Sequence, residues 1–217
     1  MSLAVRLRTD TAVSLPELPG LTIERVHDAQ FMAALQGKPV AEMQRRFDEG
    51  HHAYVARMHG EPAAWGWVAT REAIIGELKT TLLIPQNHRY LWNFVTLAPY
   101  RGMGIYPRLL NAIIEAERDA DQFWIAYAPE NRASAAGIHK AGFTTLAELS
   151  FDASGAPAVR PIAKEGGVQA AQLLGVPVVT EKLAACWRCT RTVGAAASPC
   201  STGACCCDYQ QPARECA

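Results

Sequence analysis

Five consecutive residues, Arg101-Gly102-Met103-Gly104-Ile105, stand between an apolar segment and a run of helical periodicity. A helix N-terminus presents backbone N–H groups without intrahelical partners and the positive end of the helix dipole, so it attracts anions. Gly102 and Gly104 remove two side chains from the turn, and Arg101 adds a positive charge that can reach phosphate oxygens. The loop is therefore predicted to bind a phosphate group.

The loop differs from two other phosphate-binding signatures. It lacks the lysine followed by serine or threonine of a Walker loop. It also lacks the third glycine of a dinucleotide-binding fingerprint, and no acidic residue closes the following strand. Neither a P-loop nor a dinucleotide site is expected here.

The segments around the loop predict the elements that position it. Residues 90–97 are aromatic and β-branched and predict a strand, and residues 104–117 carry apolar side chains at helical spacing. A strand at 122–128, a helix at 131–141 and a strand at 143–151 follow. This alternation predicts a mixed α/β sheet.

The flanking parts of the chain predict further elements. A strand at 21–26, helices at 28–36 and 39–50, and strands at 52–58 and 63–70 precede the loop. The turn between the last two is placed at Gly60-Glu61-Pro62, and Trp65 and Trp67 are expected to share a core-facing side. Residues 74–83 fit either strand or loop, and a strand at 158–163 and a helix at 168–174 end the predicted order.

Two segments together resemble the GNAT superfamily of N-acetyltransferases, a group of acyl-CoA N-acyltransferases. Residues 101–106 are similar to its motif A, in which arginine or glutamine, two residues, glycine, one residue and a small residue follow an apolar strand. Tyr106 departs from the small residue, so its phenol is expected to point away from the pyrophosphate. Asn131-Arg132-Ala133-Ser134 and the Gly142-Phe143 pair are similar to motif B at the usual separation. The resemblance covers roughly residues 21–151.

This resemblance implies a fold and an acyl donor. The fold is an α/β fold with a mixed, mostly antiparallel central sheet flanked by helices, in which strands 4 and 5, here 90–97 and 122–128, splay apart. Acetyl-CoA, or a CoA ester of another short acyl group, is expected in that gap, and the acyl group passes directly to a primary amine of a small molecule or peptide. The residues implied in cofactor binding are Val95, Thr96, Leu97, Arg101, Gly102, Met103, Gly104, Ile105, Asn131 and Ser134.

The proton donor for the departing thiolate does not carry over from the family. Its usual tyrosine, four residues before the Gly-Phe pair, is Ile138 in this chain. His139 is expected to face elsewhere, because a helix turns about 100° per residue. Tyr127, at the end of the predicted fifth strand, is the candidate donor. An acyl-CoA-binding protein without catalysis is therefore a second interpretation.

Three polar residues are candidates for handling the amine and its proton. Glu77 and His51 can act as bases, whereas Asn93 can only orient an amine or a water molecule. Deprotonation through ordered water would need none of them.

Composition argues against some functions, and it separates the chain into a domain and an extension. Lysine plus arginine and aspartate plus glutamate number 21 each among 217 residues, so nucleic-acid binding is not expected. No segment has the length and apolarity of a signal peptide or membrane span, which predicts a cytoplasmic protein without membrane contact. We expect an acyl-CoA-binding domain at 1–163 and an extension at 164–217, and the oligomeric state is left open.

All seven cysteines lie between Cys186 and Cys216. Cys186 and Cys189 have the spacing of a metal knuckle, and Cys200 and Cys205 can complete a zinc site, although a second CxxC pair is absent. Disulfides are not favoured without an export signal. A thioether-crosslinked peptide tail, with the folded domain as its carrier or scaffold, and an extension without a role are the remaining alternatives.

Overall fold

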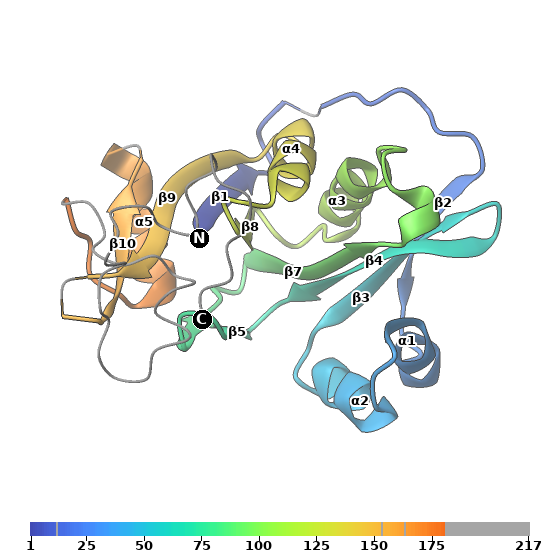
Figure 1. Cartoon of the computed structure of the whole chain (residues 1–217), viewed down its shortest axis with the longest axis horizontal. Helices are drawn as coiled ribbons and strands as arrows, with labels where there is room; N and C mark the ends of the chain where they lie inside the picture. The colour runs from blue at the N-terminus through green and yellow to red at the C-terminus, as the bar shows by residue number, and fades with distance from the viewer. Residues whose placement is uncertain (12, 153, 163, 181–217) are drawn as a thin grey trace, which may run out of the picture.

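The computed structural model describes residues 1–11, 13–152, 154–162 and 164–180. It contains an eight-stranded sheet in the order β10-β9-β1-β8-β7-β4-β3-β2 (Figure 1). Neighbouring strands are antiparallel except β7 and β8, which are parallel. The strands are β1 (Ser2–Leu7), β2 (Leu21–Val26), β3 (His52–Met58), β4 (Glu61–Ala69), β7 (His88–Thr96), β8 (Gln122–Tyr127), β9 (Thr144–Phe151) and β10 (Pro157–Pro161). The predicted mixed, mostly antiparallel sheet is confirmed.

Helices cover both faces of this sheet (Figure 1). Helices α3 (Ile105–Ala116) and α4 (Arg132–Lys140) lie on one face, and α1 (Ala29–Gln36) and α2 (Val40–Asp48) lie on the other. The hairpin of β5 (Glu72–Ile75) and β6 (Thr80–Leu83) packs with α5 (Lys164–Leu174) beside β9 and β10. A short 3₁₀ helix, η1 (Ala98–Tyr100), leads from β7 into the loop before α3.

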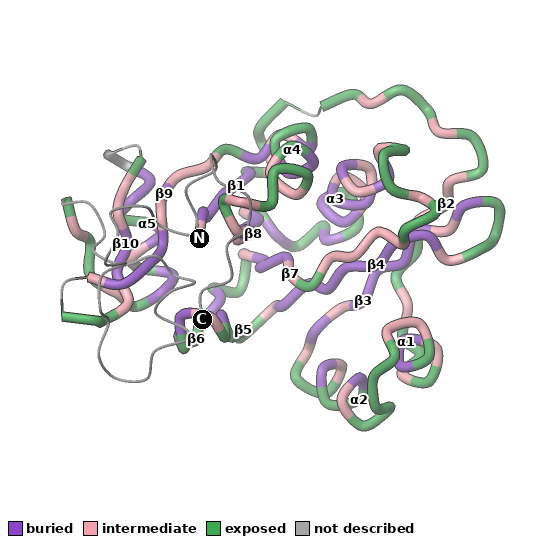
Figure 2. The backbone as a smooth tube through the Cα atoms, viewed as in Figure 1, coloured by how far each residue is buried: buried purple, intermediate pink, exposed green. Residues whose placement is uncertain are grey.

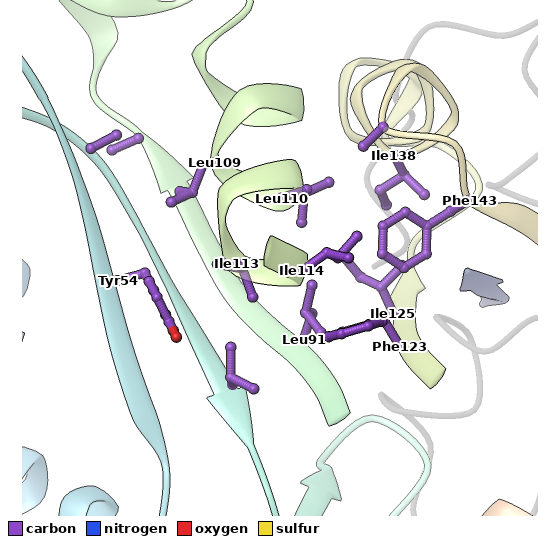
Figure 3. Close-up of a cluster of buried hydrophobic side chains, with 14 of the residues drawn as sticks. Tyr54, Leu91, Leu109, Leu110, Ile113, Ile114, Phe123, Ile125, Ile138 and Phe143 are labelled. Atoms are coloured by element: carbon purple, nitrogen blue, oxygen red, sulfur yellow. The ribbon is translucent and has the colours of Figure 1, made fainter. Parts of the chain in front are cut away.

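The alternation of side chains along β3 explains the two layers. Tyr54 and Ala56 pack beneath α3, whereas Ala53 and Val55 pack against α1 and α2. Figure 2 shows that burial is concentrated along the central strands and the sheet-facing sides of the helices. Figure 3 shows the layer beneath α3 and α4, where branched side chains of both helices meet those of β7 and β8.

The structure corrects the predicted turn between β3 and β4. The turn residues are His59 and Gly60, with φ of 52° and 88°, and Glu61 and Pro62 already belong to β4. A two-residue hairpin turn with two positive φ values matches the twist of the strands it joins. Proline is tolerated near the start of a strand, so its presence did not mark the turn.

Strand β1 was not predicted, although it lies inside the sheet between β8 and β9. Its six residues include Arg6, which is only 5% exposed because its guanidinium donates to Asn111 and to the carbonyl of Ala141. The first five of its six residues are buried, so the strand shows no alternation of buried and exposed positions, and the charge of Arg6 further obscures the pattern. The ambiguous segment 74–83 is the β5–β6 hairpin.

The parallel pair β7 and β8 separates along its length. Pairing extends only from His88 with Gln122 to Leu91 with Ile125, while β7 stays paired with β4 as far as Thr96. On that side, Gly66 of β4 lies opposite two residues of β7, which is a β-bulge. The predicted splay of strands 4 and 5 is therefore present, and the gap between them opens beyond Leu91.

None of the helices in the described ranges is both long and apolar enough to cross a membrane. The predicted zinc ligands Cys186, Cys189, Cys200 and Cys205 lie outside the described residues. Within the part of the chain that the structure describes, no three His, Cys, Asp or Glu side chains form a group that could hold a metal ion.

Candidate cofactor site

A cavity of about 610 Å³ lies where the end of β7, η1, the start of α3 and one side of α4 meet. Its size is in the range of small-molecule and cofactor sites. Sixteen residues line it, namely Phe94, Val95, Thr96, Tyr100, Arg101, Gly102, Gly104, Ile105, Tyr106, Pro107, Asn131, Ala133, Ser134, Ala136, Gly137 and Lys140.

The loop before α3 contributes two positive-φ glycines and an uncapped helix start to this cavity. Gly102 and Gly104 have φ of 80° and 72°, a left-handed conformation that residues with a Cβ rarely adopt. Gly104 is the N-cap of α3 and provides no side-chain hydrogen bond to the first helical amides. Helix α4, in contrast, is capped by Asn131, whose Oδ1 accepts from the amide of Ser134 at 3.0 Å. The first turn of α3 therefore faces the cavity without a side-chain cap.

Two cationic side chains line the same cavity. Arg101 is exposed, and its Nε donates to the carbonyl of Thr96 at 3.1 Å, which fixes the guanidinium beside the end of β7. Lys140 reaches the cavity from the last turn of α4. Positive charge thus adds to the uncapped helix start, as a phosphate site requires.

Two aromatic rings and two glycines fill the space beneath the loop. The rings of Phe94 and Tyr106 have centroids 5.4 Å apart. A Cβ on Gly66 would lie 2.0 Å from the Phe94 ring, and a Cβ on Gly137 would lie 2.4 Å from the Tyr106 ring. The glycines on β4 and α4 therefore make room for this aromatic pair, which forms the apolar side of the cavity.

Tyr106 is directed toward α4, and Ser134 is a side-chain hydrogen-bond partner of its phenol. Burial raises the pKa of this phenol above its ordinary value, so it stays protonated and uncharged. The departure from the family's small residue is thus accommodated by the packing of Tyr106 against Gly137 and Phe94.

The predicted cofactor residues mostly converge on the cavity. Eight of the ten line it, and Leu97 and Met103 do not. Ala133, Ala136, Gly137 and Lys140 also line it but were not predicted. Their spacing of three or four residues along α4 is the signal that points to one shared helix face.

The candidate proton donor Tyr127 lies on β8 two residues beyond the last pair with β7, and is 9% exposed. Its hydroxyl is 2.8 Å from Oγ1 of Thr145 on β9, and the same Oγ1 is 3.0 Å from Nε2 of His139. A hydrogen-bonded series therefore runs from Tyr127 through Thr145 to the exposed His139. Ile138, at the family's usual acid position, is fully buried and lies beside Phe143 in the core (Figure 3).

The remaining catalytic candidates lie elsewhere. Asn93 sits at the β7 bulge with φ of 52°, and its exposed amide donates to Gln36 of α1 at 3.3 Å. His51 is 8% exposed and packs edge-on against Trp92, with ring centroids 5.2 Å apart. Glu77 lies in the turn of the β5–β6 hairpin. None of the three lines the cavity.

A buried ionic cluster holds the far end of α3. The Glu117 carboxylate accepts from Arg89 at 2.7 Å and from Tyr54 at 2.7 Å, and it lies 2.5 Å from Nδ1 of His52. Burial by itself would raise the pKa of Glu117, but the hydrogen bonds from His52, Arg89 and Tyr54 outweigh it and lower the pKa to about 2. The cluster ties α3 to β3 and β7 away from the cavity.

The chain was compared with known protein families, curated proteins and solved structures. A family model described as "Acetyltransferase (GNAT) family" matches residues 21–143. No curated protein matches the chain.

Similar solved structures include a GCN5-related N-acetyltransferase from Kribbella flavida, at 20% identity and a TM-score of 0.41, over 57% of this chain and 46% of that one. The chain therefore spans about half the length of that protein. A GNAT-family acetyltransferase from Streptococcus pneumoniae is 14% identical, with a TM-score of 0.44, over 59% of this chain and 88% of that one. AAC(6')-Iy with a bisubstrate analogue is 14% identical, with a TM-score of 0.45, over 57% of this chain and 90% of that one.

Proposed function

The chain belongs to the acetyltransferase (GNAT) family, and on that premise we propose that it transfers an acetyl or another short acyl group from CoA to a primary amine of a small molecule or peptide. The cavity at the start of α3 is the observation that carries this proposal. Its uncapped helix start and two cations suit a pyrophosphate, and its aromatic side suits the uncharged arm of the cofactor.

The residues proposed to hold acetyl-CoA fall into two groups. The loop amides from Gly102 to Ile105, together with Arg101 and Lys140, would hold phosphate oxygens. The backbone of β7 at Val95 and Thr96, left without a β8 partner by the splay, would hold the amides of the pantetheine arm. Ser134 would contribute indirectly, by holding Tyr106 in place.

Bound acetyl-CoA would supply a thioester carbonyl carbon, to which the amine nitrogen bonds as the C–S bond breaks. The amine would lose one proton to solvent, and the CoA thiolate would take up one proton. Tyr127 is the proposed proton donor to the leaving thiolate, because it lies on β8 beyond the last pair with β7 and the usual acid position holds Ile138; it does not line the cavity, and its hydroxyl bonds to Thr145 of β9. Thr145 and His139 would return a proton to Tyr127 from solvent. Asn93, at the bulge, would orient the amine by accepting its N–H. Glu77 is removed from the gap on its hairpin, so a base role for it has no geometric support.

Two measurements test the proposal in sequence. A thermal-shift titration with acetyl-CoA is expected to raise the melting temperature with increasing ligand, since a ligand of the folded state stabilises it by mass action. Release of free CoA in the presence of a panel of primary amines is then expected. No shift at millimolar acetyl-CoA would refute both binding and transfer.

One observation favours a second candidate, an acyl-CoA-binding protein without turnover. Ile138 occupies the usual acid position and is part of the core. A thermal shift with acetyl-CoA but no CoA release with any amine would support this alternative.

A further inference from the structure

Among the residues that the structure describes, six buried side-chain nitrogen atoms in the layer between α1, α2 and the sheet lack a hydrogen-bond partner. Native proteins leave few buried polar atoms unpaired, and an unpaired buried N–H costs about 1–3 kcal/mol. Five of these atoms are obligate donors, so the layer has a surplus of N–H groups and needs an oxygen acceptor. The atoms, here called the donor layer, are Nη1 of Arg46, Nε2 of Gln36, Nδ1 of His51 and Nε1 of Trp65, Trp67 and Trp92.

The donor layer is contiguous and centred on Arg46. The Arg46 guanidinium lies 5.0 Å from the Trp67 ring and 4.7 Å from the Trp92 ring, and its side chain is only 9% exposed. His51 packs edge-on against Trp92. Arg46 lies against two adjacent indoles, whose ring centroids are 6.3 Å apart, and one end of its guanidinium is already engaged, because Nη2 donates to Glu42 at 2.6 Å. That contact shows that a carboxylate can bind this guanidinium at its exposed edge.

The donor layer also borders the gap between β7 and β8. Trp92 is half-buried and immediately precedes Asn93 at the bulge, and Gln36 accepts the hydrogen bond of Asn93. The cofactor cavity lies on the α3 and α4 side of the same strand. Since the cofactor would occupy that side, a second substrate reaches the gap from the side of α1 and α2. Trp92 and Gln36, the half-buried members of the donor layer, are the part of it that such a substrate meets first.

From this arrangement we propose that the acyl acceptor is an amine that also carries a carboxylate, and that Arg46 with the neighbouring N–H groups binds this carboxylate. The inference rests on the proposed function and names the class of its acceptor. The charged group that pairs with Arg46 is Glu42, which binds Nη2. Nη1 of the same guanidinium has no partner among the described residues. Burial lowers the pKa of His51 to about 4, so His51 adds no positive charge at neutral pH. A polycationic amine finds a buried cation here and is disfavoured.

This proposal is tested by measuring the affinity of candidate acceptors and not their turnover, so the result does not depend on whether the protein is catalytically active. The full chain is saturated with CoA, and a ladder of ω-amino acids with two, four and six carbons is titrated against the alkylamines of the same lengths. Thermal shift or calorimetry reports the affinity of each compound. At one length or more, the amino acid is expected to bind at least tenfold more tightly than its alkylamine. Equal affinities at every length, or no binding of any amino acid, would overturn the proposal.

Variants of α2 assign the effect to Arg46. Arg46→Gln is expected to weaken amino-acid binding roughly 10- to 100-fold, the range for a lost charge-assisted hydrogen bond, and to leave alkylamine binding unchanged. Arg46→Lys, which keeps the charge if the glutamine variant does not fold, is expected to retain part of the preference. Glu42→Gln is expected to increase amino-acid affinity, because it removes the competing carboxylate.

The matched control is Arg45→Gln. Arg45 is the neighbouring arginine on α2, it is 63% exposed, and it pairs with Glu49. Its loss is expected to change nothing, and an equal loss of amino-acid affinity in both arginine variants would overturn the proposal by showing a nonspecific charge effect. An unchanged acetyl-CoA shift in every variant would show that the cofactor side, and with it the first part of the proposed function, is intact.

Discussion

The two faces of the sheet carry proposed binding sites that are built in different ways. On the α3 and α4 face, the proposed ligand contacts are backbone amides, and glycines at 102, 104 and 137 create the necessary space. On the α1 and α2 face, the contacts are long side chains, with Arg46 and Trp92 brought together from separate elements. A backbone site is therefore sensitive to an added Cβ, whereas a side-chain site is sensitive to the loss of one functional group. Substitutions of each kind can test whether this division holds.

The largest effect is expected from Gly104→Asp in the loop. The substitution places a Cβ at φ of 72°, and its carboxylate repels an anion at the helix start. We expect at least a 100-fold loss of acetyl-CoA affinity, measured by thermal-shift titration. Gly155→Asp is the control, because Gly155 also has a positive φ of 82° but lies in the turn between β9 and β10. An equal loss of acetyl-CoA affinity in both variants would show that the substitution acts by destabilising the fold and not by altering the loop.

The Glu117 cluster should contribute to the stability of the fold but not to its affinity for acetyl-CoA. Glu117→Gln leaves the buried Arg89 with only the exposed carboxylate of Asp119 as its ionic partner, so the free energy of unfolding should fall by about 3 kcal/mol, the lower end for a broken buried pair, in denaturant titration. The acetyl-CoA affinity of the remaining folded protein should stay within twofold. A large affinity loss in a folded variant would mean that the far end of α3 controls the cavity.

The same carboxylate predicts a pH dependence with a defined sign. The folded pKa of Glu117 is about 2, below its ordinary 4.5, so the unfolded chain binds the proton more readily. Its contribution to stability is complete above pH 4.5 and is lost as the pH falls toward 2. The wild-type protein should show this loss in acid titration, and Glu117→Gln should show less of it.

A smaller effect is expected from crowding the aromatic pair. Gly137→Ala places a methyl group 2.4 Å from the Tyr106 ring, which must then move into the cavity. Acetyl-CoA binding should weaken about tenfold, and removal of the ring by Tyr106→Ala should make Gly137→Ala nearly neutral. A double-mutant cycle on acetyl-CoA affinity measures this coupling. Additive losses would show that Gly137 acts on binding independently of Tyr106.

The smallest effect should follow from Thr145→Val, which removes the hydroxyl between Tyr127 and His139. If this series returns the proton, kcat should fall a few-fold while the KM for acetyl-CoA is unchanged, and Tyr127→Phe should lower kcat more. Steady-state CoA release measures both. An unchanged kcat in Thr145→Val would remove the threonine from the mechanism, and an unchanged kcat in Tyr127→Phe would remove the donor.

Prediction from the sequence succeeded where neighbours along the chain decide the structure. Strand β2 and helix α3 were placed to within a residue or two, and Asn131 caps α4 as expected. Most of the predicted cofactor residues line the cavity, because each of the two motifs that contain them can be recognised from contiguous residues. Prediction failed at Glu61 and Pro62, where the required turn conformation fell one residue earlier on His59 and Gly60.

The sequence by itself determined the glycine turn between β7 and α3, since glycine spacing and strand and helix periodicity are properties of contiguous residues. Only the tertiary structure decided that β1 enters the sheet, that Asn93 stands at a bulge beside the gap, and that Arg46 lies against Trp67 and Trp92. These features depend on the register of strands far apart in the chain. Register is fixed by packing of whole faces, which no local pattern of residues specifies.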